Sequence, residues 1–122
     1  MKIVTWNTPV NADWPRALEL KELVFSTTGL TLNVEEEAGT CWQIAFKSVQ
    51  AFKSTTEECA GLLVAQLPEK GGLFEVLDSS WLKELNGGGF LEKSHHYIVC
   101  CYDEVIEVVA WEAEITAACV NQ

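Results

Sequence analysis

The chain has 122 residues, and its eighteen acidic and eight basic side chains give a formal net charge of −10 at pH 7. Such a length suits one domain, and a hydrophobic share of 48% with five tryptophans is enough to build a core, so disorder is excluded. The negative average field repels nucleic-acid backbones and anionic lipids, which disfavours direct nucleic-acid binding and membrane attachment.

The first half of the chain carries mainly strand patterns. Residues 17–25 fit either a helix or a strand, and the apolar end of the segment favours a strand. Residues 26–29 have the composition of a turn, and apolar residues alternate over 30–34, so the two segments form a predicted hairpin. Alternation is clearest over residues 41–53, which predicts a further strand.

The middle of the chain mixes helix and strand signals. Two overlapping capping-box patterns begin at Ser54 and Thr55 and favour a short helix within residues 57–67, although a strand there stays open. Residues 73–77 then predict a strand. Residues 78–80 can cap a short helix through Trp81, Leu82 and Leu85, which ends at Asn86 and Gly87. The glycines at positions 71–72 and 87–89 are interpreted as turns, because neither group is followed by the Lys-Ser or Lys-Thr of a phosphate loop.

The last third predicts two strands, over residues 97–102 and 105–111, joined by a tight turn at residues 103–104. A helix capped by Asp103 is the alternative, but the density of Val and Ile favours strands. No internal repeat or linker divides the chain, so residues 1–122 form one predicted domain. The expected fold class is α+β, dominated by an antiparallel β-sheet with one or two short helices packed on one face.

The only histidines, His95 and His96, are neighbours in the chain. Adjacent strand residues point to opposite faces, so the two imidazoles are not expected to ligate one ion, and a structural or surface role is favoured over catalysis. The adjacent thiols Cys100 and Cys101 lie inside an apolar strand pattern, which favours burial over metal binding or redox sensing. The sequence predicts no catalytic residue, no metal site and no cofactor.

The five cysteines form an odd set without regular spacing, which argues against a disulfide framework and for a reducing compartment. The apolar stretch at the N-terminus is too short for a signal-peptide core, and no run approaches the ~20 apolar residues of a membrane span. We therefore expect a cytoplasmic protein.

Acidic residues form several clusters that together could make a surface for a basic partner protein. The alternative is that they are ordinary solvated loops and helix starts. Glu107 lies in an apolar strand pattern, so it is either a charged gatekeeper at a sheet edge or a buried acid with a raised pKa, and the gatekeeper or a paired structural role is favoured. The candidate partner-binding residues are Glu35, Glu36, Glu37, Asp103, Glu104 and Glu107.

Five segments carry a resemblance to known proteins: WQIAF at 42–46, VQAF at 49–52, FEVLDSSWL at 74–82, HYI at 96–98 and YDEVIEVVA at 102–110. In their order they resemble small, uncharacterised bacterial proteins, some of them similar to immunity proteins of polymorphic toxin systems. The resemblance implies a protein that binds and neutralises a partner. The acidic composition agrees with that implication, because a negative surface suits a basic target.

The function expected from the sequence is therefore that of a non-catalytic acidic binding protein that masks or neutralises a partner protein. Two other classes remain open. One is a small-ligand carrier with an aromatic pocket lined by the sheet. The other is an enzyme that uses His95 or His96 with an acid or a thiol.

Overall fold

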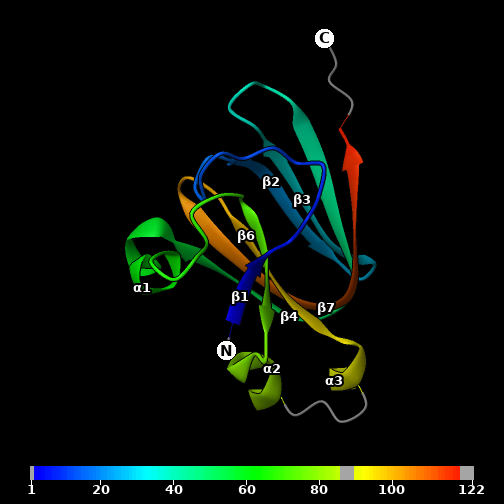
Figure 1. The fold of residues 1–122 in the computed structure, drawn as a ribbon. Helices are drawn as coiled ribbons and strands as arrows, with labels where there is room; N and C mark the ends of the chain where they lie inside the picture. Colours follow the sequence, from blue (N-terminus) through cyan, green and yellow to red (C-terminus); the bar gives the residue numbers. More distant parts are fainter. Residues whose placement is uncertain (1, 86–89, 119–122) are drawn as a thin grey trace.

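The computed structural model describes residues 2–85 and 90–118. In this part of the chain, seven antiparallel strands form one sheet in the order β1-β5-β6-β7-β4-β3-β2 (Figure 1). The strands are β1 (Lys2–Thr5), β2 (Glu19–Ser26), β3 (Gly29–Glu35), β4 (Cys41–Thr56), β5 (Leu73–Leu77), β6 (His95–Cys100) and β7 (Glu104–Ala117). The helical elements are a 3₁₀ turn η1 (Glu57–Cys59) and the short helices α1 (Gly61–Val64), α2 (Ser80–Glu84) and α3 (Phe90–Lys93). The expected sheet-dominated α+β fold is confirmed.

The long strands β4 and β7 hold the sheet together. They pair along almost their whole length, from Trp42 opposite Ala117 to Thr56 opposite Glu104. The first part of β4 also pairs with β3, and the first part of β7 pairs with β6. A bulge interrupts β4 between Val49 and Ala51, just after Ser48, whose φ is 54°, and the sheet curves strongly over its length (Figure 1). The two strands thereby connect both ends of the molecule.

Both faces of the sheet are buried, by different parts of the chain. On one face, side chains such as Phe46, Val99 and Ile106 form a core that Trp6 and Val10 of the N-terminal segment cover. The core on the other face is covered by η1, α1 and the residues that follow them. Its buried members are Ala60, Leu67, Phe74, Val76, Ile98, Cys100 and Val105. Burial on both faces explains the continuous apolar run in β7.

The strand predicted for residues 17–25 is confirmed as β2, and its hairpin with β3 turns at residues 26–29. Gly29 has a φ of +140°, and a Cβ there would lie 2.4 Å from the carbonyl oxygen of Phe46. Only glycine fits this close approach without a shift of the backbone. The hairpin of β6 and β7 and the short helix α2, capped by Ser79, are also as predicted.

The helix predicted within residues 57–67 is present as η1 and α1, but neither Ser54 nor Thr55 caps it. Ser54 and Thr55 belong to β4, where they pair with Ile106 and Val105, and the helical residues start only at Glu57. Pairing with β7 therefore outweighs the local capping pattern. If these residues became helical, the end of β4 would lose its backbone hydrogen bonds to β7. α3 is an element that the sequence did not predict. The glycine turn predicted at 87–89 lies outside the described residues.

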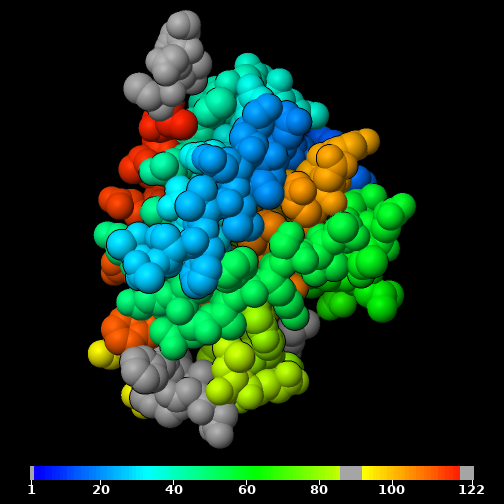
Figure 2. Space-filling view, turned by 180° about the vertical axis from the view of Figure 1, so that it is seen from behind, coloured from blue at the N-terminus to red at the C-terminus, as the bar shows by residue number. Residues whose placement is uncertain are grey.

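The chain before β2 lies against the β6–β7 turn. Leu18 forms a parallel bridge with Cys101, and the Tyr102 backbone N–H donates to the Leu18 carbonyl oxygen at 2.8 Å. From behind, residues near 100–104 (orange) lie beside the blue segment that leads into β2 (Figure 2). Within residues 2–85 and 90–118, no helix has the length and apolar character needed to cross a membrane.

Candidate functional site

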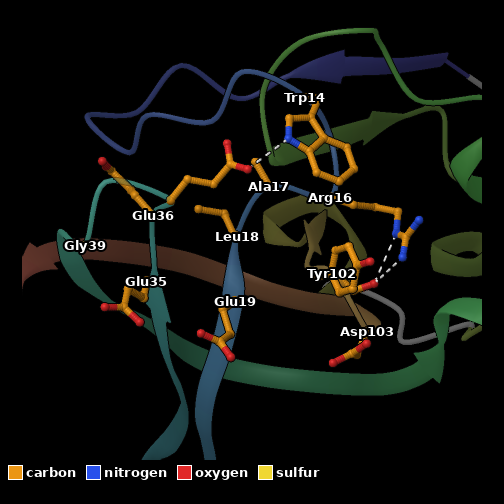
Figure 3. Close-up of a pocket in the computed structure, with 11 residues that line it drawn as sticks. Trp14, Arg16, Ala17, Leu18, Glu19, Glu35, Glu36, Gly39, Tyr102 and Asp103 are labelled. Atoms are coloured by element: carbon orange, nitrogen blue, oxygen red, sulfur yellow. Dashed lines mark hydrogen bonds between the residues drawn. The ribbon is translucent and has the colours of Figure 1, made fainter.

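A cavity of about 360 Å³ opens where the chain before β2, the end of β3 and the β6–β7 turn meet (Figure 3). We call this cavity and the residues that line it the acidic cleft. Its acidic lining residues come from three parts of the sequence that lie far apart, and Arg16 lies among them. They are Glu19, Glu35, Glu36, Glu37 and Asp103.

The acidic cleft forms because contacts of Arg16 hold the start of β2 against the β6–β7 turn. The Arg16 guanidinium donates from Nε and Nη2 to the carbonyl oxygen of Tyr102, at 3.0 and 2.7 Å. The same guanidinium lies 4.6 Å above the Tyr102 ring and 3.6 Å from a Glu57 carboxylate oxygen. Arg16 therefore links the start of β2 to the β6–β7 turn. Its positive charge interacts with both the Tyr102 carbonyl and the Glu57 carboxylate.

Two exposed aromatic rings stand at the acidic cleft. Trp14 and Tyr102 are 38% and 53% exposed, and their rings meet edge to face with centroids 6.3 Å apart (Figure 3). Trp14 Nε1 donates to a carboxylate oxygen of Glu37 at 3.4 Å. Tryptophan and tyrosine dominate the energetics of many protein interfaces, and their faces attract cations. The cleft thus combines negative charge with the ring types that bind cationic side chains.

Glu36 differs from the other acids of the cleft because it is buried. One of its carboxylate oxygens, Oε2, accepts hydrogen bonds from the Asn11 backbone N–H at 2.8 Å and from Trp42 Nε1 at 2.6 Å. In Figure 3 its side chain turns away from Glu35. Glu36 therefore anchors the N-terminal segment and supports the wall of the cleft.

The remaining carboxylates crowd one another. Burial raises the pKa of Glu104, and the neighbouring Asp103 and Glu19 carboxylates raise it further. Lys21 lies 3.5 Å from carboxylate oxygens of both Glu19 and Glu35, and these two acids raise its pKa. A cation bound beside Asp103 and Glu19 would relieve the repulsion at Glu104, whereas Lys21 already balances part of the charge of Glu19 and Glu35.

The structure thus brings together four of the six candidate residues, Glu35, Glu36, Glu37 and Asp103, with Glu104 next to them in the chain. Glu107 lies elsewhere. Its alternative role as a gatekeeper at a sheet edge is wrong, because β7 lies between β6 and β4 in the interior of the sheet. Glu107 is a buried acid, paired with His96 and Lys53.

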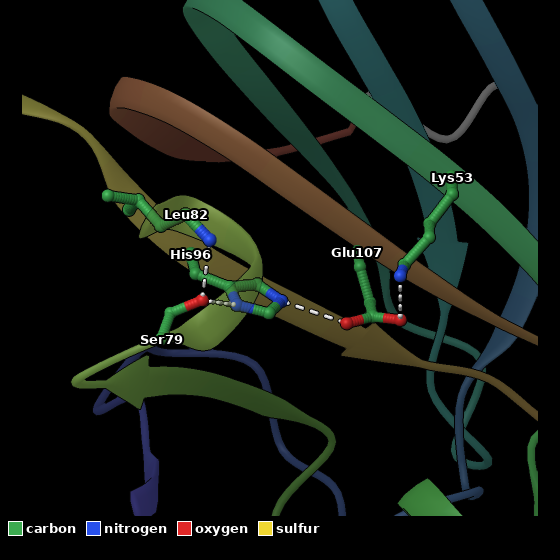
Figure 4. Close-up of polar contacts among 5 residues, drawn as sticks. All are labelled: Lys53, Ser79, Leu82, His96 and Glu107. Atoms are coloured by element: carbon green, nitrogen blue, oxygen red, sulfur yellow. Dashed lines mark hydrogen bonds and ion pairs between the residues drawn. The ribbon is translucent and has the colours of Figure 1, made fainter. Parts of the chain in front are cut away.

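A second polar group crosses the sheet on the face that α1 covers. Glu107 Oε1 lies 2.8 Å from His96 Nε2, and Glu107 Oε2 lies 3.8 Å from Lys53 Nζ (Figure 4). On its other side, His96 Nδ1 lies 2.7 Å from the Oγ of Ser79, which also accepts the Leu82 backbone N–H at 3.1 Å. We call Ser79, His96, Glu107 and Lys53 the polar row.

The polar row follows from strand order. Lys53 on β4 pairs directly with Glu107 on β7, and Ile98 on β6 is the partner of Glu107 on the other side. His96 lies two residues before Ile98 on the same face, within reach of the Glu107 carboxylate. Ser79 follows the end of β5, which pairs with β6. Each of four consecutive strands thereby supplies or leads to one member.

The prediction that the two histidines point to opposite faces is confirmed. His95 is exposed, and its Nδ1 lies 2.9 Å from a carboxylate oxygen of Glu75, whereas His96 is buried in the polar row. The partners of His96, Ser79 and Glu107, come from other segments of the chain, so residues near it in the sequence do not reveal them.

The burial predicted for the adjacent thiols is confirmed, since Cys100 and Cys101 are fully buried on opposite faces of the sheet. Burial raises the pKa of Cys100 to about 11 and raises that of Cys101 as well. The value for Cys100 is two units above the ordinary 9.0, so at pH 8 its thiolate fraction falls about a hundredfold.

We therefore expect iodoacetamide at pH 8 to modify the exposed Cys59 at least about a hundredfold faster than Cys100 or Cys101 in the folded protein. Peptide mapping by mass spectrometry over time gives the separate rates. In concentrated urea the three rates should converge, which is the control for intrinsic reactivity. Rapid modification of Cys100 without urea would contradict its burial.

Sequence reasoning missed Glu19, Trp14 and Tyr102 at the cleft, and Ser79 in the polar row. Glu19 is a single acid in a strand, and exposed aromatic residues look like core residues in a sequence. Ser79 was recognised only as part of a helix cap, which it is. No local signal distinguishes these residues, because their neighbours in space come from distant segments.

Comparison of the chain with protein-family models, curated proteins and solved structures finds no match. Among the described residues, no group of three or more His, Cys, Asp or Glu side chains is arranged to hold a metal ion. The acidic cleft and the polar row are therefore the features from which a function can be inferred.

Proposed function

We propose that this protein is an acidic binding protein of the bacterial cytoplasm that masks a basic partner protein through the acidic cleft, in the manner of an immunity protein. One observation carries the proposal: exposed Trp14 and Tyr102 stand beside carboxylates from three separate segments around one cavity. Interfaces of this composition recognise lysine and arginine side chains by charge and by ring stacking.

The net charge of −10 supports the same proposal at longer range. A strongly negative protein attracts a basic partner before contact, which raises the association rate and makes it sensitive to salt. The volume of the cleft, about 360 Å³, accommodates one or two cationic side chains rather than a whole domain. Most of the contact area would then lie on the rim formed by the β6–β7 turn and the loop after β3.

The test compares two variants that have equal net charge. The first neutralises the four acids of the cleft that are not buried, and its changes are Glu19→Gln, Glu35→Gln, Glu37→Gln and Asp103→Asn. The second neutralises four exposed acids that do not line the cleft, and its changes are Glu58→Gln, Glu69→Gln, Glu84→Gln and Glu114→Gln.

Each protein is immobilised, and bacterial lysate is passed over it at about 50 mM and about 500 mM salt. We expect wild type and the second variant to retain one basic protein at low salt and the cleft variant to lose it. With that protein purified, stopped-flow measurements should show association slowed roughly tenfold to a hundredfold by the cleft changes alone. Equal retention by the two variants would place the binding surface elsewhere, and retention of acidic proteins only would remove the charge argument.

A further inference from the structure

The polar row opens onto a cavity that is separate from the acidic cleft. This cavity has a volume of about 260 Å³ and lies between the end of β5, the start of β6 and α2. Ser79 and His96 line it, together with the apolar side chains of Val76, Leu77 and Leu82. An ion pair between Lys83 and Asp78 closes one part of its rim.

The hydrogen bonds of the polar row assign a role to each nitrogen of His96. A carboxylate can only accept, so the Nε2 that faces Glu107 carries a hydrogen. In the neutral imidazole, Nδ1 is then an acceptor with a free lone pair. Ser79 Oγ already accepts the Leu82 N–H, and its own hydroxyl hydrogen is available to donate to Nδ1 at 2.7 Å.

A hydroxyl that donates to an imidazole, which in turn donates to a carboxylate, is the arrangement that activates a serine nucleophile. The two nitrogens have exchanged places relative to the usual triad, since Nδ1 faces the serine here and Nε2 faces the acid. The exchange leaves the chemistry unchanged, because both imidazole nitrogens can take up and release a proton. Ser79, His96 and Glu107 are 5%, 4% and 8% exposed, so water has little access to the hydrogen bonds between them.

We propose that Ser79, His96 and Glu107 form a serine-hydrolase site for esters of short acyl groups, distinct from the acidic cleft. Ser79 Oγ forms a bond to the carbonyl carbon of the ester while its proton passes to His96 Nδ1. The bond to the alcohol then breaks, and the alcohol leaves with that proton. A water molecule that takes the place of the alcohol in the cavity gives a proton to the same nitrogen and adds to the acyl carbon. The bond from that carbon to Ser79 Oγ then breaks, the acyl group leaves as the carboxylic acid, and Oγ regains its proton from His96.

The cavity limits the substrate class. Its volume and the apolar side chains of Val76, Leu77 and Leu82 suit an acyl chain of a few carbons. Ser79 and His96 touch the reacting atoms in this reaction and are its catalytic residues. Glu107 acts through His96, so it is a positioning residue that holds the ring and balances its charge, with Lys53 beside it.

Diisopropyl fluorophosphate is the probe that tests the proposal. Attack by Ser79 Oγ forms a P–O bond and expels fluoride, while His96 takes the proton. Intact mass should rise by one diisopropylphosphoryl group, and peptide mapping should place it on Ser79. The same protein should hydrolyse 4-nitrophenyl acetate, with a burst if deacylation is slow.

Three variants make the test specific. Ser79→Asn keeps a side-chain acceptor for the Leu82 N–H, so the helix cap survives while the nucleophile is lost, and labelling should disappear. Ser80→Ala removes the exposed neighbouring hydroxyl and should label as wild type does. His96→Gln removes the base and should slow labelling at least about a hundredfold. The acidic-cleft variant should label normally, which separates this proposal from the binding function.

Glu107→Gln should slow labelling and also change the pH at which labelling is half-maximal, and a loss of stability alone does not move that midpoint. Circular dichroism and thermal melting establish that each variant is folded. Mapping the label on the wild-type protein needs no variant, so the test survives if a variant does not fold. Wild-type protein that stays unlabelled, or a label on any residue other than Ser79, would overturn the proposal.

Discussion

Replacement of Glu107 by alanine is expected to lower the free energy of unfolding by about 3 kcal/mol. The change removes the only described acceptor of His96 Nε2, a buried donor 2.8 Å from the carboxylate, and it leaves Lys53 without its cross-strand partner at 3.8 Å. Urea unfolding followed by tryptophan fluorescence measures the loss. Glu107→Gln should recover part of it, because the amide oxygen can still accept from His96.

Glu112→Ala is the matched control. Glu112 lies on the same strand, but it is exposed and pairs with Lys47 at 4.0 Å, so its removal should change stability by no more than about 0.5 kcal/mol. Equal effects of the two alanine substitutions would show that Glu107 is solvated, and the polar row would then lose both its structural and its proposed chemical role.

A second large effect is expected at Glu36, where alanine should cost about 2–3 kcal/mol. Its carboxylate oxygen accepts from both the Asn11 backbone N–H and Trp42 Nε1, so its loss leaves two donors without their acceptor. Near-ultraviolet circular dichroism should also change, since Trp42 loses the contact that orients its ring. Thermal melting and urea unfolding measure the cost in stability.

The neighbouring Glu37 supplies the control, because it is exposed and the bond it accepts from Trp14 is long, at 3.4 Å. Glu37→Ala should leave stability within about 0.5 kcal/mol of wild type and act on partner association instead. If Glu37→Ala lowered stability and Glu36→Ala did not, the structural role inferred for Glu36 and the binding role inferred for Glu37 would both be contradicted.

These two predictions concern acidic residues that the sequence alone did not divide into buried and exposed ones. Glu36 and Glu37 belong to one acidic run, and Glu107 lies in an apolar strand, so all three were candidates for partner contact. The structure buries Glu36 and Glu107 and leaves Glu37 exposed. Whether such a side chain is buried depends on which distant segments pack against it. The residues next to it in the sequence do not reveal those segments.

The sequence by itself determined most strands, two hairpins and the burial of Cys100 and Cys101. Each of these depends on an alternation of apolar and polar residues or on turn residues within a few positions, and such signals are local. At Ser54 and Thr55 the capping pattern predicted the start of the helix, but pairing with β7 extends β4 to Thr56, so the helical residues begin at Glu57.

Only the tertiary structure decided which residues meet. The acidic cleft needs Leu18 beside Cys101, and the polar row needs β4, β7, β6 and β5 in that order across the sheet. Strand order depends on the free energy of packing the whole chain, to which every pairing contributes, and alternation along one strand does not reveal its neighbours. For this reason the composition predicted an acidic surface, while the pairing of Ser79 with His96 and Glu107 emerged only from the fold.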